Sequence, residues 1–342
     1  MSKDNNRFAG ILKDLHKKYG ADSAMILSEG NPSEVKEVVS SGIDVIDHHI
    51  LGVGGIPVGR MGEVSGLSGS GKTSFGFSLI ANFQKAGGLT ILVETEDALQ
   101  VQRAELFGVD LSRVLLLSPG SMEDGMDQVV SILNCIEPDT GPNLVVWDSI
   151  AATLTNREVK GDAGDGMMAE KARVLSRNLP KLTSLLPKTR TALVLINQVR
   201  ANIGGYGAAT STPGGNAIQF YSSWRMEFSA GTKKKKGDTT IAQDSLVKAT
   251  KNKLAYPFRS GRVRLRFATG FDNGWSNLNY AKDAKLVPPG TKDAAYGHRL
   301  ATSALSTFDE VLNPTPWPLH VEDDVVESEE PVTLEETEEE AT

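Results

Sequence analysis

Eight consecutive residues near the start of the chain have the types and spacing of a phosphate-binding loop. Residues 66–73 read G-x-x-x-x-G-K-[ST], in which the glycines let several backbone N–H groups converge on one anion. The lysine places a point charge beside the β and γ phosphates, and the last hydroxyl is a Mg²⁺ ligand. The predicted nucleotide-binding residues are Gly66, Leu67, Ser68, Gly69, Ser70, Gly71, Lys72 and Thr73.

The flanking residues supply the elements that must position this loop. Residues 61–65 predict a short buried strand, and residues 74–83 carry apolar side chains at helical spacing. A strand, a glycine-rich turn and a helix in this order place bound phosphates at a helix N-terminus. The pattern therefore predicts a nucleotide-driven protein.

Three further strand ends carry side chains that suit the same chemistry. Residues 144–147 are apolar and run into Asp148, a carboxylate that would hold Mg²⁺ together with the hydroxyl of Thr73. The strand over residues 89–93 ends in acidic residues, and either Glu94 or Glu96 could activate a water. Strand alternation puts both on one side, which leaves the choice open. Residues 192–196 end in an amide pair that includes Gln198, which suits a γ-phosphate sensor.

Composition limits the class of protein. The chain has 342 residues and one cysteine, Cys135, which excludes an internal disulfide and favours a reducing, intracellular setting. Cys135 is expected to be buried in a helix, and no apolar run is long enough for a membrane span. Eleven acidic residues follow position 321, and removing them from the net charge of −7 leaves +4. We expect a disordered acidic tail beside a mildly basic body.

The apolar pattern predicts an α/β fold with a mostly parallel central sheet. Residues 1–37 hold an amphipathic helix and a linker, 38–271 the α/β core, 272–320 a small C-terminal module and 321–342 the tail. Two long loops, residues 156–167 and 201–213, leave strand ends beside the nucleotide, where loops of this length are usually functional. Strands are expected at 89–93, 114–117, 144–147 and 192–196, and helices at 6–19, 100–107, 122–136 and 168–186, the last kinked or split at Pro180.

Taken in order, these motifs resemble the RecA-type DNA recombinases, from the N-terminal helix to about Gly274. Beyond the phosphate-binding loop, the resemblance rests on residues 54–60 (GGIPVGR), 96–99 (EDAL), 148–152 (DSIAA), 196–200 (INQVR), 214–217 (GGNA) and 248–253 (KATKNK). It implies a RecA-like P-loop ATPase core that uses ATP and Mg²⁺. The N-terminal helix would then dock on the next copy in an oligomer.

The resemblance also assigns roles to individual residues. Glu96 matches the catalytic glutamate and Gln198 the γ-phosphate sensor, so the choice between the two glutamates falls on Glu96. Lys251 and Lys253 match lysines that reach the ATP of the neighbouring subunit in a filament. The residues expected to bind single-stranded DNA are Arg173, Arg177, Arg200, Tyr206, Gly214, Gly215 and Asn216.

The chain departs from the family at two places. Gln100 and Arg103 stand where the family usually has an acidic residue and an aromatic beside the adenine, which affects base selectivity. Ser229 and Ala230 replace paired basic residues of the duplex-binding region, but lysines 233–236 follow directly. We take these lysines as a hypothetical site for double-stranded DNA, with a merely solvated loop as the alternative.

The predicted function is a DNA-dependent ATPase that forms a helical filament on single-stranded DNA and catalyses homologous pairing and strand exchange. The first alternative is a related P-loop DNA motor or a repair accessory ATPase. The second is a DNA-coating filament protein that uses nucleotide only as a switch. The expected location is the cytoplasm of a bacterium or of a phage-infected host, without a membrane partner.

Overall fold

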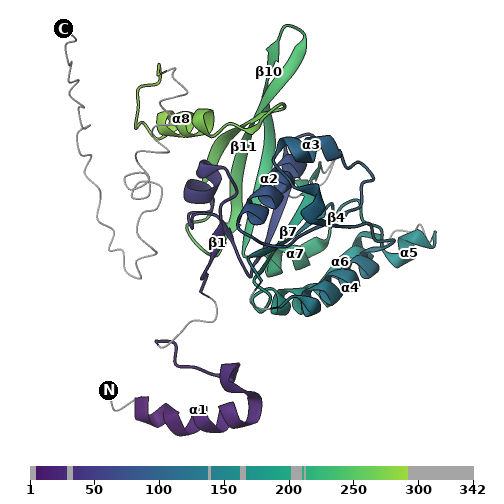
Figure 1. The fold of residues 1–342 in the computed structure, drawn as a ribbon, viewed down its shortest axis with the longest axis vertical. Helices are drawn as coiled ribbons and strands as arrows, with labels where there is room; N and C mark the ends of the chain where they lie inside the picture. The colour runs from purple at the N-terminus through teal and green to yellow at the C-terminus, as the bar shows by residue number, and fades with distance from the viewer. Residues whose placement is uncertain are drawn as a thin grey trace, which may run out of the picture.

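A nine-stranded sheet forms the centre of the molecule (Figure 1). The computed structural model describes residues 5–28, 34–137, 140–161, 167–201, 210–211 and 213–291. The strand order is β13-β12-β11-β10-β3-β7-β6-β4-β5. The strands are β3 Met61–Gly66, β4 Thr90–Glu94, β5 Val114–Leu117, β6 Asn143–Asp148, β7 Thr191–Gln198, β10 Trp224–Lys236, β11 Thr239–Asn252, β12 Ser260–Arg266 and β13 Gly270–Phe271.

The strands from β10 to β5 run parallel, so their carboxyl ends meet at one edge of the sheet. The predicted α/β fold with a mostly parallel sheet is confirmed. Every residue of β3, β4 and β6 is buried, because helices cover both faces of this part of the sheet. One face carries α2 (Lys72–Lys85), and the other carries α4 (Met122–Cys135), α6 (Met167–Leu185) and α7 (Gly215–Tyr221).

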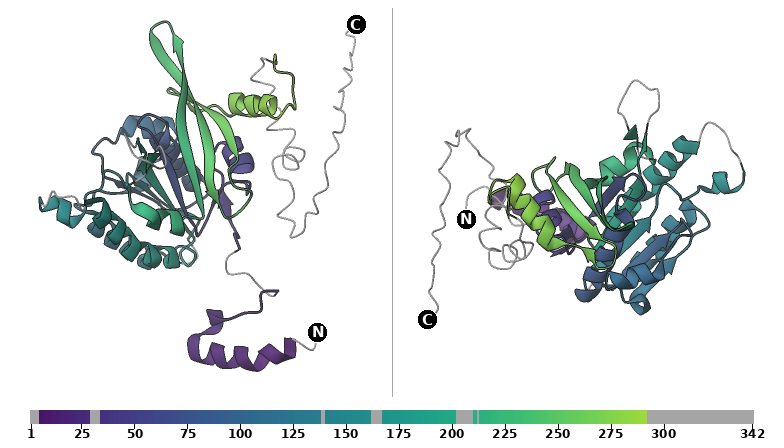
Figure 2. Two further views of the ribbon diagram at one scale, coloured as in Figure 1. Left: turned by 180° about the vertical axis from the view of Figure 1, so that it is seen from behind. Right: turned by 90° about the horizontal axis from the view of Figure 1, so that it is seen from above.

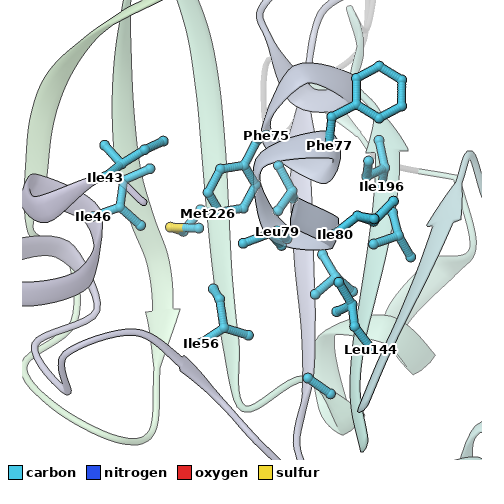
Figure 3. Close-up of a cluster of buried hydrophobic side chains, with 14 of the residues drawn as sticks. Ile43, Ile46, Ile56, Phe75, Phe77, Leu79, Ile80, Leu144, Ile196 and Met226 are labelled. Carbon is cyan, nitrogen blue, oxygen red and sulfur yellow. The ribbon is translucent and has the colours of Figure 1, made fainter. Parts of the chain in front are cut away.

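The hydrophobic core divides between these two faces because successive strand residues point in opposite directions. Along β6, Leu144 and Val146 pack with the residues of α2, whereas Val145 and Trp147 pack with α4 and α6. Figure 3 shows the first of these clusters, where Phe75 and other side chains of α2 lie against the sheet. The two cores together fix α2, and therefore the loop before it, against the carboxyl ends of the strands.

A long antiparallel hairpin of β10 and β11 projects beyond the sheet (Figures 1 and 2). Lysines 233–236 are the last residues of β10, and Gly237 turns the chain with a φ of 59°. These lysines therefore end a strand and do not form the solvated loop that was the alternative to a site for double-stranded DNA. The apolar residues of β10 alternate at Trp224, Met226 and Phe228 and form no continuous apolar run, unlike the strands that the sequence predicts.

The first and last helices of the described chain differ in whether they pack on the sheet. The predicted N-terminal helix is confirmed as α1 (Asn5–Tyr19), which lies apart from the sheet in Figures 1 and 2. In contrast, α8 (Asn273–Asp283) packs on the core, since Nδ2 of Asn277 donates to Oδ2 of Asp44 at 2.7 Å. The rest of the expected C-terminal module and the acidic tail lie outside the described residues.

Two smaller expectations change with the structure. Helix α6 continues through Pro180 and is not split. Cys135, at the end of α4, is exposed because the buried face of that helix, which includes Met126, Val129 and Leu133, does not include it. The other elements are β1 Val38–Val39, β2 Ile56–Pro57, β8 Arg200–Ala201, β9 Thr210–Ser211, α3 Val101–Leu106, α5 Asn156–Val159, η1 Ala21–Ser23, η2 Val45–Ile50 and η3 Leu111–Arg113.

Candidate nucleotide-binding site

The predicted phosphate-binding loop connects the end of β3 to the start of α2. Gly71 has a φ of 103°, and a Cβ atom at Gly66 would lie 2.2 Å from the carbonyl oxygen of Phe228, so both positions require glycine. The Oγ of Ser70 is buried and has no hydrogen-bond partner among the described residues. The first N–H groups of a helix also lack partners within it. The loop therefore has the geometry of an anion site.

A cavity of about 540 Å³ opens beside this loop and brings together side chains from both halves of the core. The sequence-predicted residues that line it are Ser68, Gly69, Gly71, Lys72, Thr73, Glu96, Gln100, Arg103, Asp148 and Gln198. The lining residues that sequence reasoning missed are Ser74, Phe77, Ala98, Ala230, Lys233, Thr240, Gln243, Leu265 and Phe267. Most of these residues belong to strands β10, β11 and β12 or follow them directly. They were not predicted to line the cavity because those three strands were not predicted.

The two predicted metal ligands are in contact. Oγ1 of Thr73 donates to Oδ2 of Asp148 at 2.7 Å. Burial raises the pKa of Asp148 to about 6, although the bond from Thr73 opposes the shift. Two oxygen donors this close to an anion site match the ligands that Mg²⁺ takes in proteins when phosphate oxygens complete its shell. No cluster of three or more His, Cys, Asp or Glu side chains that could hold a metal is found among the described residues.

Lys72 lines the cavity, and its Nζ donates to the carbonyl oxygen of Leu67 at 2.8 Å. Desolvation lowers the pKa of Lys72, and the carboxylates of Asp148 and Glu96 counteract this shift. A phosphate that enters the cavity would offer Lys72 a charged acceptor, and a charge-assisted hydrogen bond of this kind is stronger than the present bond to a neutral carbonyl oxygen.

The structure separates the two candidate glutamates. Glu94 is buried, and its carboxylate accepts hydrogen bonds from the backbone N–H groups of residues 96–98 at 3.0 to 3.2 Å. Its side chain therefore stabilises the turn after β4. Strand alternation does not extend to Glu96, because the strand ends at Glu94 and the backbone then turns, with a left-handed φ of 51° at Asp97.

Glu96 is exposed toward the cavity and is held by two neighbours. Its Oε1 accepts hydrogen bonds from Oγ of Ser149 at 2.6 Å and from Nε2 of Gln198 at 2.7 Å. These contacts join the ends of β4, β6 and β7. Glu96 and Gln198 thus lie together at the same edge as the phosphate-binding loop, as the sequence predicted.

The residues predicted beside the base form another wall of the cavity. Nη2 of Arg103 donates to Oγ of Ser74 at 2.8 Å, and its guanidinium lies 6.0 Å from the ring centre of Phe267. Gln100 directly precedes α3 and also lines the cavity. An aromatic ring and a planar cation offer surfaces on which a base can stack.

The β10–β11 hairpin is bound directly to the phosphate-binding loop. Nε2 of Gln243 donates to the carbonyl oxygen of Gly69 at 2.8 Å, and Oγ of Ser245 donates to that of Ser70 at 3.1 Å. Lys233 lines the cavity. The lysine run is therefore divided between the nucleotide cavity and the outer hairpin.

The outer lysines of the hairpin also differ among themselves. Lys234 is half-buried and lies 3.7 Å from Asp244, whose carboxylate also accepts two hydrogen bonds from Arg264. Lys235 and Lys236 are exposed near the turn. Of the four lysines, these two are therefore the ones most available to a partner outside the chain.

Lys251 and Lys253 lie far from the cavity of their own chain. The register pairs Asn252 with Trp224 at the start of β10, so both lysines are at the opposite edge of the sheet from the phosphate-binding loop. Nζ of Lys251 donates to the carbonyl oxygen of Gln219 in α7. Burial lowers the pKa of Lys251, and the charge of Lys253 lowers it further.

Of the residues predicted to bind DNA, the described ones gather at α6 and α7. Arg173 and Arg177 are exposed one turn apart on α6, and Arg173 pairs with Glu170 at 2.7 Å. Gly214, Gly215 and Asn216 begin α7. Tyr206 lies outside the described residues, and only the backbone of Arg200 is described.

The two glycines that begin α7 also have a packing role. A Cβ atom at Gly214 would lie 2.7 Å from Leu175 of α6, and one at Gly215 would lie 3.0 Å from Ala172. Both glycines have a positive φ. Close approach of α7 to α6 therefore explains the glycines without any DNA contact.

Comparison with known proteins identifies the family. The model of the RecA N-terminal domain matches residues 7–272. The chain is 36% identical to Protein RecA of Thermus aquaticus over 294 residues, and this aligned region covers 84% of each chain. It is 35% identical to Protein RecA of Delftia acidovorans over 81% of this chain and 74% of that protein, and 33% identical to Protein RecA of Azoarcus over 83% and 82%. Within the described residues no helix could span a membrane. The chain therefore belongs to the RecA family, whose members are DNA-dependent ATPases that act in recombination and repair.

Proposed function

We propose that this chain hydrolyses ATP with Mg²⁺ at a site shared between adjacent copies in a filament on single-stranded DNA, and that the filament pairs this strand with a homologous duplex. One observation carries the proposal. Glu96, Gln198 and the phosphate-binding loop lie at one edge of the sheet, and Lys251 and Lys253 lie at the other. Such an arrangement can complete one copy's cavity with the next copy's lysines.

The nucleotide would be held by the residues that already line the cavity. Lys72 and the amides of the phosphate-binding loop would hold the β and γ phosphates. Thr73 and Asp148 would hold Mg²⁺, which would neutralise charge on the phosphates when bound. Arg103 and Gln100 would face the base beside Phe267.

The hydrolytic water would be placed by Glu96. Its carboxylate is exposed in the cavity and can accept a proton from water, which Glu94 cannot do while it holds three backbone N–H groups. Gln198 donates to the same oxygen of Glu96. Since a bound γ-phosphate would offer acceptors to this amide, Gln198 would exchange one partner for the other, which makes it a sensor.

Two surfaces would contact DNA. Arg173, Arg177, Arg200 and the start of α7, with Tyr206, would hold the single strand through phosphate contacts and stacking. Lys235 and Lys236 at the exposed hairpin would bind the duplex. With DNA as the partner, the working location would be the cytoplasm of a bacterium or of a phage-infected host.

A pair of glutamate variants tests the enzymatic assignment. Glu96→Gln should lower the rate of DNA-stimulated ATP hydrolysis by about 100-fold or more while single-stranded DNA binding with ATP persists. Glu94→Gln is the matched control, from the same strand end, and should retain hydrolysis at a rate nearer to that of the unaltered chain. The assignment fails if Glu96→Gln hydrolyses ATP normally or if Glu94→Gln is the inactive variant.

A further inference from the structure

The cavity beside the phosphate-binding loop has two ends with different chemistry. Among the described residues that line it, the carboxylates are those of Glu96 and Asp148. Both are held at the phosphate end, by hydrogen bonds from Gln198 and Thr73 at 2.7 Å each. Within the described residues, the side chains that line the end facing the base are therefore neutral or cationic.

Gln100 and Arg103 present their side chains together at the base end. The backbone N–H of Arg103 donates to the carbonyl oxygen of Gln100 at 3.0 Å. The two residues are therefore one helical turn apart, and side chains at this spacing lie on the same face of a helix. Gln100 is exposed, and its side chain does not cap α3. Its amide group is therefore available to a ligand in the cavity that it lines.

Arg103 keeps most of its hydrogen-bond donors for the cavity. Its half-buried side chain donates from Nη2 to Oγ of Ser74 at 2.8 Å, and its guanidinium lies 6.0 Å from the ring centre of Phe267. In the described part of the chain, no carboxylate pairs with this guanidinium. The guanidinium is planar and carries several N–H donors in a fixed fork. Donors other than the one that Ser74 accepts therefore remain for a ligand.

Adenine and guanine differ in what they offer to these two side chains. Guanine presents the acceptors O6 and N7 on the edge where adenine presents the acceptor N7 and the N6 amino donor. The fork of an arginine matches O6 and N7 of guanine, and the amide of a glutamine matches N6 and N7 of adenine. A carboxylate at this place would accept from the amino group of adenine and repel O6 of guanine. Arg103 attracts O6 instead, so the pocket lacks this means of rejecting guanine.

We propose that the base end of the cavity accepts guanine as well as adenine, so that the chain binds and hydrolyses GTP in addition to ATP. Arg103 donates to O6 and N7 of guanine, and Gln100 pairs with either base because its amide can present its oxygen or its nitrogen. The reaction at the phosphate end is the same for both nucleotides. Water adds to the γ-phosphorus, the bond to the β–γ bridging oxygen breaks, and Glu96 takes the proton, which gives GDP and phosphate. The inference rests on the function proposed above and broadens its substrate.

Displacement of a fluorescent ADP analogue from the wild-type chain measures the base preference directly. The chain is titrated with ADP, GDP and CDP in the presence of Mg²⁺ and without DNA, so that the result depends neither on hydrolysis nor on DNA binding. We expect the dissociation constant of GDP to lie within about 10-fold of that of ADP, and CDP to bind more weakly than either. A constant for GDP more than about 10-fold above that for ADP, or a constant for CDP equal to that for GDP, would overturn the proposal.

The variant Arg103→Met removes the fork and keeps a long unbranched side chain. Loss of a bidentate contact to a base lowers affinity by about 5- to 150-fold. The affinity for GDP should therefore fall more than the affinity for ADP, and the ratio of the two constants should change by about 5-fold or more. A variant that keeps the circular dichroism spectrum and the ratio of the wild type would refute the role of Arg103.

Lys233→Ala is the matched control, because Lys233 is another cation that lines the cavity. Lys233 is the cross-strand partner of Gln243, whose side chain donates to the carbonyl oxygen of Gly69. Cross-strand partners share one face of the sheet, so Lys233 lies on the side of the phosphate-binding loop. Its loss should weaken the binding of ADP and GDP by the same factor. If it changes their ratio as much as Arg103→Met does, the effect is one of general charge, and the proposal fails.

Hydrolysis in the presence of single-stranded DNA separates this inference from the proposed function. The wild-type chain should hydrolyse both GTP and ATP, with values of kcat/KM within about 10-fold of one another. If it hydrolyses ATP alone, the inference about GTP fails and the proposed function stands. If it hydrolyses neither nucleotide although GDP and ADP bind with comparable constants, the proposed function fails and the base preference stands.

Discussion

Replacing Asp148 by asparagine should stabilise the nucleotide-free protein while it removes one proposed ligand of Mg²⁺. Asp148 is buried, and its pKa is raised from an ordinary 3.8 to about 6, first by desolvation. A carboxylate with a raised pKa binds protons more tightly in the folded state than in the unfolded state. The free energy of unfolding therefore falls as pH rises from about 4 to about 6, and the full penalty remains above pH 6.

The size of the effect follows from the two pKa values. The difference between 3.8 and about 6 corresponds to about 3 kcal/mol at pH 8, and to about 1.5 kcal/mol at pH 5, where most of the folded protein is neutral at this position. Asparagine has no charge at any pH and can still accept the bond from Thr73. The stability advantage of Asp148→Asn should therefore grow by about 1.5 kcal/mol between pH 5 and pH 8.

Denaturant unfolding of both proteins at several pH values, without Mg²⁺ or nucleotide, measures this difference. Carboxylates remote from Asp148 titrate alike in both proteins and cancel in the comparison, whereas Glu94 and Glu96 interact with Asp148 and add a smaller difference. Addition of Mg²⁺ and an ATP analogue should stabilise the wild type more than Asp148→Asn. A variant that is less stable than the wild type at pH 8, or an advantage that does not change with pH, would refute the reasoning.

Three further results are expected. Lys233→Ala should raise the KM for ATP several-fold because Lys233 lines the cavity. Lys236→Ala, at the exposed end of β10, should leave the KM unchanged. Equal KM values for the two variants would contradict this prediction. The double variant with Lys251→Ala and Lys253→Ala should lower ATP hydrolysis only under filament-forming conditions, because both lysines lie away from the cavity of their own chain. An equal loss of hydrolysis in isolated monomers would exclude a shared site. Removal of residues 322–342 should strengthen DNA binding most at low salt, and titrations across a salt series that show no change would end that idea.

Much of the nucleotide site could be predicted because its signals are local. The phosphate-binding loop is one continuous segment, and Asp148 and Gln198 each end an apolar run that the sequence displays. Parallel strands place such ends at one edge of the sheet. The meeting of residues that are distant in sequence can therefore be predicted even when the strand register is unknown. The contact between Thr73 and Asp148 follows from this rule.

Other parts depend on pairings that no local pattern reveals. Asn197 meets Glu63 across 134 residues, and both would be read from the sequence as ordinary polar residues in apolar strands. Strand alternation alone left the choice between Glu94 and Glu96 open, because that choice depends on where β4 ends, and only the family resemblance pointed to Glu96. The β10–β11 hairpin was not predicted, because the apolar residues Trp224, Met226 and Phe228 alternate with polar ones and form no apolar run, and four lysines and two glycines follow them.

The most direct test of the account is electron microscopy of the chain with single-stranded DNA and a non-hydrolysable ATP analogue. We expect helical filaments in which each nucleotide lies between two copies, with Lys72 and Glu96 from one copy and Lys251 and Lys253 from the next. Closed rings, as a P-loop motor would form, or filaments in which the lysines lie away from the nucleotide, would contradict it.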